Sequence, residues 1–193
     1  SAGVPLPPAQ IQEHAQRLAM IHEVDPRPRR NPELLRRVGN AHQWIHRACL
    51  DLSEASRLEQ CPPPTAEWIL DNEYVVESNA RDVQLNLPRQ FLKELPVLAN
   101  EPFRGLPRTY GLAKELVSYT GLRLDRENML AFIETYQSAH TLTIGELWAI
   151  PQMLRIALIE GIRDLAARAL TELREGEIAD FWANRLITAN RRD

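Results

Sequence analysis

The sequence has few of the residues that mark common catalytic and metal-binding proteins. It contains two cysteines, Cys49 and Cys61, and eight glycines in 193 residues. No Cys/His spacing is typical of a zinc site, and there is no phosphate-binding glycine loop, dinucleotide fingerprint or Gly-x-Ser-x-Gly elbow. These absences indicate a reduced protein without the usual nucleotide-binding motifs. A disulfide between the two cysteines would require Cα atoms that lie close together.

The sequence also lacks a strong charge and a long apolar run. There are 23 Lys and Arg against 26 Asp and Glu, a formal charge of -3, which gives no reason to expect nucleic acid or an anionic membrane surface as the main partner. The most apolar stretch is interrupted by Glu146, Arg155 and Glu160. A membrane-spanning helix needs about 20 apolar residues. No such span is predicted.

No segment alternates polar and β-branched residues as a half-buried strand does. Apolar residues recur instead at helical spacing, and the hydrophobic fraction of 44% fits a globular core. We therefore predict an all-α fold, an irregular bundle of about seven to eight helices without a sheet. Residues 1–30 are expected to form a peripheral N-terminal helix and linker, and residues 31–193 a helical domain. The expected helices are 8–23, 31–58, 65–86, 89–98, 107–120, 125–139 and 144–175, with a last one after Gly176.

Several of these helices have start signals in the sequence. Asn31 followed by a proline, Thr65 after a triple proline, and Asp125 are expected N-caps, because their side-chain oxygens can accept free backbone N–H groups. Thr143 and Glu146 match a capping box. Each signal predicts where a helix begins.

Stop signals are fewer. Gly121 is the expected left-handed cap after the helix that Pro107 opens. Pro151 should either kink the helix around it or mark the true start of that helix. Gly176 is expected to separate the last two helices.

Polar side chains inside the apolar helical stretches are the candidate site residues. Glu67 and Asp71 lie four residues apart on one helix face, and a carboxylate pair at this spacing could carry acid/base chemistry on a sugar. Alternatively, such carboxylates could form ion pairs with arginines that fix the order of the helices. The remaining polar candidates are Asn72, Arg108, Arg155, Glu146 and Glu160.

Histidines and aromatic residues allow further readings. His42 and His46 could hold a metal from one helix face with Cys49, but could equally be ordinary helix histidines, and no metal site is predicted. The aromatic side chains could form a sugar-stacking platform or, at helical spacing, part of the core. The side chains of the helix over residues 65–86 that are expected to point inward are Trp68, Ile69, Tyr74, Val75 and Val76. The aromatic residues are Trp44, Trp68, Tyr74, Tyr110, Tyr119, Tyr136, Trp148 and Trp182.

A series of motifs in order along the chain resembles one known family. The motifs are Thr65–Asn72 (TAEWILDN), Leu87–Arg89 (LPR), Glu94–Pro96 (ELP), Leu106–Ala113 (LPRTYGLA), Leu142–Ala149 (LTIGELWA) and Leu154–Ile156 (LRI). Together they resemble the N-terminal region of cyclic β-1,2-glucan synthases, very large bacterial membrane proteins, and the likeness runs from about residue 31 to 165. Several motifs in order are more specific than any one alone.

The resemblance implies an accessory helical domain of a much larger polypeptide at the cytoplasmic side of the bacterial inner membrane. It implies that the whole protein makes cyclic β-1,2-glucan from UDP-glucose with a divalent metal. It also implies that this domain packs against other domains of the same chain or holds the glucan. No catalytic residue and no cofactor of this domain follows from it. The Tyr110 and Trp148 side chains, both inside its motifs, join the polar candidates. The alternatives are a sugar-processing domain that uses the paired carboxylates and an unrelated protein-binding module.

Overall fold

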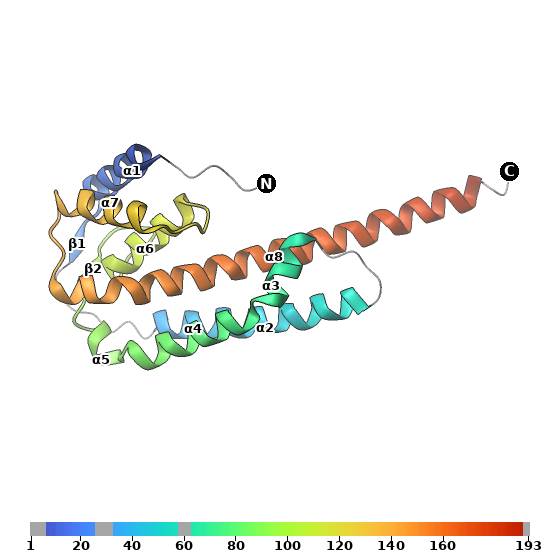
Figure 1. The fold of residues 1–193 in the computed structure, drawn as a ribbon, viewed down its shortest axis with the longest axis horizontal. Coiled ribbons are helices and arrows are strands. Elements are labelled where there is room, and N and C mark those ends of the chain that lie inside the picture. Colours follow the sequence, from blue (N-terminus) through green and yellow to red (C-terminus); the bar gives the residue numbers. More distant parts are fainter. Residues whose placement is uncertain (1–6, 26–32, 58–62, 191–193) are drawn as a thin grey trace.

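The computed structural model describes residues 7–25, 33–57 and 63–190. These residues form eight α-helices and one small antiparallel pair of strands, in an arrangement shown in Figure 1. The elements are α1 (Pro8–Ile21), β1 (Val24–Asp25), α2 (Glu33–Arg57), α3 (Pro64–Asp71), α4 (Glu73–Asn86), α5 (Arg89–Leu92), β2 (Val97–Leu98), α6 (Arg108–Tyr119), α7 (Arg126–Gln137) and α8 (Ile144–Asn190). The all-α prediction is confirmed, and the one departure is this small two-stranded sheet, since no sheet was predicted.

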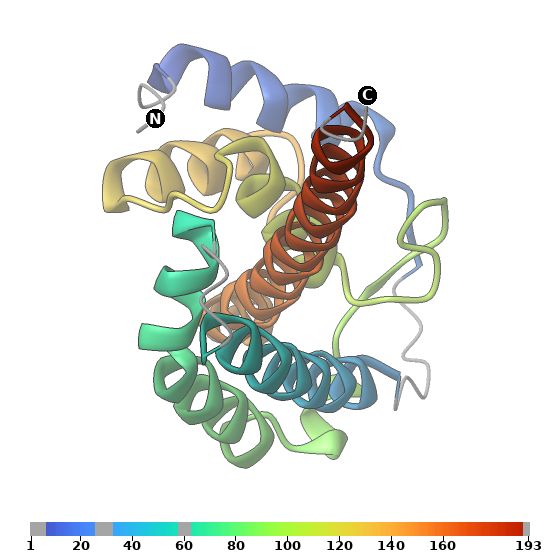
Figure 2. The same ribbon diagram turned by 90° about the vertical axis from the view of Figure 1, so that its right-hand side faces the viewer.

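The long helix α8 organises the molecule. It packs against α6, α2, α4 and α3, while α1 packs on α7. Viewed end-on in Figure 2, α8 passes through the middle of the bundle, with α1 and α7 above it and α2 and α4 below it. The core is one continuous cluster of apolar side chains contributed by all of these helices.

The two strands have two residues each, and Val24 pairs with Leu98. They contribute no layer of their own. Leu98 is held further by a hydrogen bond from its N–H group to the carbonyl of Leu106. The pair thus ties the end of α1 to the irregular segment before α6. This segment was predicted as one helix over residues 89–98, but the helix ends at Leu92, before Pro96.

Capping signals in the sequence predicted several helix ends correctly. The Asp125 side chain accepts the N–H group of Asn128 at 2.8 Å. In the capping box, the N–H of Glu146 donates to Thr143 Oγ1 at 3.2 Å, and the N–H of Thr143 donates to Glu146 Oε2 at 2.9 Å. Gly121 has φ 59° after α6, as expected of a left-handed cap. These interactions lie within a few residues of sequence, which is why the pattern reveals them.

One predicted helix start is wrong, and one of the two alternatives for Pro151 is excluded. Pro63 is the N-cap of α3 and Pro64 its first residue, so Thr65 lies inside the first turn; the fixed φ of proline suits that position. Helix α8 begins at Ile144 and continues through Pro151, which therefore does not mark its start. The expected Asn31 cap lies outside the described residues.

The predicted single helix over residues 65–86 is two helices. Asn72 separates α3 from α4, and its side-chain Nδ2 donates to the carbonyl of Trp68 at 2.7 Å. An Asn side chain that binds a nearby carbonyl competes with the helical backbone bonds. The break does not shift the buried face, because Ile69, Val76, Ala80 and Val83 keep one helical spacing across it. Trp68, Tyr74 and Val75 lie off that face and are exposed instead of buried. Ile69 and Val76 point inward as predicted.

Gly176 does not separate two helices. Helix α8 runs unbroken from Ile144 to Asn190, which includes this residue. A glycine in a helix costs only about 1 kcal/mol relative to alanine, so the strong helical pattern on both sides continues through it. Figure 1 shows the C-terminal part of α8 extending well beyond the other helices.

Candidate functional site

The most buried charged groups of the described chain are two glutamates of α8. Glu146 is 0% exposed and Glu160 is 1% exposed. Isolated carboxylates at such positions would be strongly unfavourable, because burial removes their hydration. Each glutamate is therefore expected to have partners, and each anchors a separate cluster of side chains.

The first cluster centres on Arg108, the first residue of α6, which is only 5% exposed. Its Nε and Nη2 donate to the two carboxylate oxygens of Glu146 at 2.7 and 2.6 Å, and Nη2 also donates to the carbonyl of Thr141 at 3.2 Å. Thr143 Oγ1 donates to Glu146 Oε2 at 3.1 Å. Burial lowers the pKa of Arg108, but Glu146 and Tyr136 together raise it by more. The pair is a two-pronged buried salt bridge between α6 and α8.

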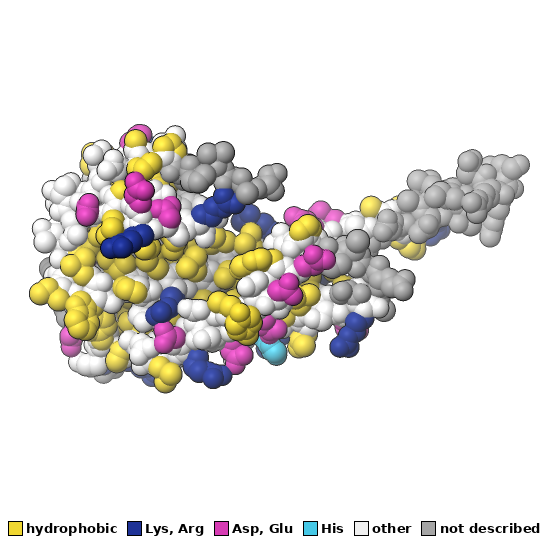
Figure 3. All heavy atoms as spheres, viewed as in Figure 1, with side chains coloured by type: hydrophobic (Ala, Val, Ile, Leu, Met, Phe, Trp, Pro, Cys, Tyr) yellow, Lys and Arg dark blue, Asp and Glu magenta, His cyan; other side chains and the backbone are white. Residues whose placement is uncertain are grey.

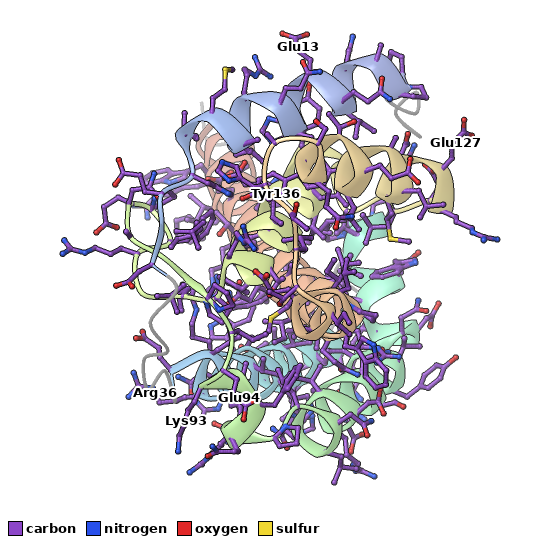
Figure 4. The ribbon with its side chains drawn as sticks, turned by 90° about the vertical axis from the view of Figure 1, so that its left-hand side faces the viewer. Glu13, Arg36, Lys93, Glu94, Glu127 and Tyr136 are labelled. Carbon is purple, nitrogen blue, oxygen red and sulfur yellow. The ribbon has the colours of Figure 1, made fainter. Side chains whose placement is uncertain are left out.

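Tyr136 and His22 extend this cluster toward α1. The Tyr136 hydroxyl lies 3.0 Å from His22 Nδ1, and its ring meets the His22 ring edge to face at 5.6 Å. Figure 4 shows Tyr136 in the interior, whereas charged side chains such as Glu13 and Glu127 point outward. Burial, together with the charges of Arg108 and His140, lowers the pKa of His22 to about 4. His22 is therefore neutral at pH 7.

The His22 pKa predicts a pH-dependent stability. The unfolded chain binds a proton at His22 below about pH 6.5, whereas the folded chain binds it only near pH 4. The contribution of this group is thus fully present above about pH 6.5 and is lost as the pH falls toward 4. Between about pH 6.5 and pH 5, the free energy of unfolding should fall by about 2 kcal/mol through this group.

Urea unfolding of the chain and of a His22→Gln variant across this pH range would measure the effect. Glutamine keeps a polar partner for the Tyr136 hydroxyl but does not titrate, so the difference in stability between the two proteins should shrink as the pH is lowered. A difference that is constant with pH would contradict the assignment.

The second cluster centres on Glu160. One of its oxygens, Oε1, accepts Arg37 Nε at 3.0 Å, while Oε2 accepts the Tyr110 hydroxyl at 2.7 Å and Lys114 Nζ at 2.9 Å. The Arg37 guanidinium also lies over the Tyr110 ring, 5.5 Å from its centroid. Burial raises the pKa of Glu160, but the donors from Lys114, Tyr110 and Arg37 lower it by more. This cluster joins α2, α6 and α8.

Among the polar candidates predicted from the sequence, the structure brings together Arg108 with Glu146 and Tyr110 with Glu160. Arg155 pairs with Asp82 of α4 at 2.7 Å. The proposed carboxylate pair, Glu67 and Asp71, is exposed on α3, unlike the buried Glu146 and Glu160. Trp148 is 78% exposed on the first turns of α8.

The sequence reading missed Arg37, Lys114, Tyr136 and Asp82 as partners. Lys114 follows Tyr110 by four residues, one helical turn, so a shared target could have been inferred from spacing. His22 has no signal in the sequence beyond its place in the helical spacing of the first helix. The other partners are far apart in sequence and carry no local signal.

The structure also shows where the histidines, the cysteine Cys49 and the aromatic side chains lie. Among the described residues, no group of three or more His, Cys, Asp and Glu could hold a metal ion; His46 Nδ1 lies 2.6 Å from Glu73 Oε1. Cys49 is a buried free thiol whose pKa burial raises to about 11, and Cys61 lies outside the described part. Tyr110 and Tyr136 are core residues, but the core reading is wrong for the exposed aromatics Trp44, Trp68, Tyr74, Trp148 and Trp182.

An open groove of about 830 Å³ runs along α8. Leu158 and Ile162 of α8 form part of its floor, and Trp68, Val75 and Leu122 stand at its sides. A smaller cleft of about 320 Å³, lined by Lys114, Ser118 and Asp164 among others, shares Gly121, Leu122 and Leu165 with it. In Figure 3, hydrophobic side chains gather across the middle of this face, along α8 and between α7 and α4. Glu67, Asp71, Glu146 and Glu160 do not line either hollow.

The described residues form a helical domain in which the two buried carboxylates, Glu146 and Glu160, connect helices and line neither the groove nor the cleft. Within the described ranges, no helix is long and apolar enough to cross a membrane. No family model matches the chain.

Over 127 residues, 66% of the chain, the sequence is 40% identical to the cyclic beta-(1,2)-glucan synthase NdvB of Rhizobium meliloti (strain 1021). The chain spans only 4% of the length of that protein. It thus contains a region related to this synthase, which confirms the family resemblance of its motifs.

Proposed function

We propose that the chain is an accessory, non-catalytic helical domain of a cyclic β-1,2-glucan synthase. In this proposal the domain supports synthesis from UDP-glucose, which other parts of the same polypeptide carry out with a divalent metal at the cytoplasmic side of the bacterial inner membrane. The observation that supports the proposal is that the buried carboxylates are bound to side chains of other helices. Both oxygens of Glu146 and of Glu160 are occupied by partners on other helices, so neither is available as a general acid or base.

The exposed part of α8 supports packing against a neighbouring domain. Ile178, Phe181 and Trp182 are 55–59% exposed on the part of the helix that extends beyond the bundle. Their spacing of three and four residues places them on one helix face. An exposed apolar stripe of this kind is typical of a protein-protein contact.

The alternative of a sugar-processing domain would use Glu67 and Asp71. Both carboxylates are exposed on α3 and neither lines the groove or the cleft. A glycoside-cleaving pair must flank the scissile bond within a shaped site. The geometry of α3 therefore favours the accessory role.

Membranes that contain the full-length synthase provide the test. Replacing Ile178, Phe181 and Trp182 together by glutamine should reduce the cyclic glucan made from UDP-glucose at least tenfold. The matched control replaces Leu50 and Leu85, two exposed apolar residues of α2 and α4, and should retain synthesis. Undiminished synthesis by the triple variant and by a deletion of residues 33–170 would overturn the accessory role. Lost synthesis in Glu67→Gln and Asp71→Asn variants that fold normally would favour the sugar-processing alternative.

A further inference from the structure

The groove along α8 combines an apolar floor with polar edges. Leu158, Ile162 and Leu165 of α8 lie in it at helical spacing, and Val75 and Trp68 face it from α4 and α3. Trp68 is 51% exposed, although an indole ring is among the most favourable side chains to bury. The groove is within the size range of small-molecule sites, which are mainly apolar with a few placed polar groups. The half-exposed indole at its side therefore provides a flat apolar surface for a ligand.

The polar groups at the groove retain unused hydrogen-bonding capacity. Arg155 uses Nη1 on Asp82, and a guanidinium has five N–H donors in all. Asn79 uses Nδ2 on the carbonyl of Val75 at 2.8 Å, which leaves its side-chain oxygen as an acceptor. Ser118 lines the adjoining cleft and can both donate and accept. The two hollows therefore offer both donors and acceptors, as hydroxyl groups require.

The groove along α8 fits a neutral ligand better than a phosphate, because most of its lining is apolar. Only Arg123 and Arg155 are charged among the residues that line it; Arg155 pairs with Asp82, and Arg123 has an interaction partner of its own. In the adjoining cleft, Lys114 shares Glu160 with Arg37, and Arg168 is a further cation of the lining. The cleft is also lined by the carboxylate of Asp164, which lies 2.6 Å from Arg163. A carboxylate next to a phosphate would be repulsive. This arrangement favours an uncharged ligand with apolar faces and hydroxyl edges.

We infer that the groove between α3, α4, the α6–α7 turn and α8 binds a short segment of neutral β-linked glucan, with Trp68 stacked on a sugar ring. This inference rests on the proposed function, because the related synthase is named for its glucan product. Sugar rings present C–H faces to aromatic rings and hydroxyl groups to the polar edges. The domain thus holds glucan in addition to docking on its neighbours.

Titration of the 193-residue chain with a linear β-1,2-linked gluco-oligosaccharide, followed by calorimetry and amide NMR, tests the inference. Saturable binding should shift the amides of Asn79, Gly121 and Leu122. Trp68→Ala should weaken binding at least tenfold, and Val75→Arg, which fills the groove from an exposed position, should do the same. Trp148→Ala is the matched control and should bind like the parent chain. Circular dichroism should show that all three variants retain the fold.

Three results would overturn the inference: no saturable binding of the oligosaccharide, binding that Trp68→Ala leaves unchanged, or displacement of the oligosaccharide by inorganic phosphate or UDP. The last would make the groove an anion site. If the chain does not bind glucan but the triple variant at Ile178, Phe181 and Trp182 loses synthesis, only the inference of a glucan-binding groove is overturned. If the chain binds glucan but synthesis is undiminished in the triple variant and in the deletion of residues 33–170, only the accessory role is overturned.

Discussion

Replacing Arg108 by alanine should destabilise the domain by about 3 to 5 kcal/mol, the cost of leaving a buried charge without its partner. Glu146 is fully buried and both of its oxygens accept from Arg108, so the substitution strands a carboxylate in the core. Total stabilities of about 5 to 15 kcal/mol are usual for single domains. Urea unfolding followed by circular dichroism would measure the loss, with the midpoint falling steeply.

Two further variants define the cause. Arg81 forms an ion pair with Glu77 at 2.8 Å, but both side chains are more than half exposed. Arg81→Ala should therefore cost about 0.5 kcal/mol or less. Replacing the buried pair together, with Arg108→Met and Glu146→Leu, should recover much of the stability, because apolar side chains of similar size remove the desolvation penalty. Similar losses for Arg108→Ala and Arg81→Ala would refute the structural role of the buried pair.

Replacing Glu160 by glutamine should cost about 3 kcal/mol, because Arg37, Lys114 and Tyr110 lose a charged acceptor at once. Glutamine keeps the volume, but its NH₂ group faces donors and cannot accept from them. Thermal and urea unfolding would measure the change. The matched control is Glu172→Gln, an exposed position on the same helix, which should be nearly neutral.

The same carboxylate should contribute to acid sensitivity. Its folded-state pKa lies below the ordinary value of 4.5, because its three donors outweigh the burial that raises it. The stability that it provides is thus present above about pH 4.5 and is lost as the pH falls through the folded pKa. The cost of Glu160→Gln should accordingly diminish in acid. A cost that is independent of pH down to acid unfolding would contradict this account.

The two clusters suggest how the domain keeps its helix order. Glu146 and Glu160 both bind residues of α6, and Glu160 also binds Arg37 of α2. Apolar packing alone is weakly directional, whereas a two-pronged Arg–carboxylate contact has fixed geometry. The contacts of α8 with α2 and α6 are therefore set in register by charged groups inside an otherwise apolar core. This agrees with the interpretation of the carboxylates as ion pairs that fix helix order.

The exposed tryptophans show that helical spacing alone does not place a side chain in the core. The helical spacing of Trp68, Trp148 and Trp182 is compatible with core positions, yet each is at least half exposed. Periodicity indicates that a residue shares a face with its neighbours along a helix. It does not indicate how wide the face is that meets the core, as at Trp68, or whether a helix extends beyond its partners, as α8 does.

The sequence by itself determined the helical class and the relation to a glucan synthase. It also determined the helix ends that are marked by Asp125, by Gly121 and by the capping box of Thr143 and Glu146. Caps and turns depend on atoms a few residues apart, so the chain carries their signal locally. Only the tertiary structure decided that Glu146 meets Arg108, that Glu160 collects donors from three positions, and that Trp68 faces an open groove. These contacts join residues 38 to 123 positions apart, and the packing of α8 against the other helices brings them together.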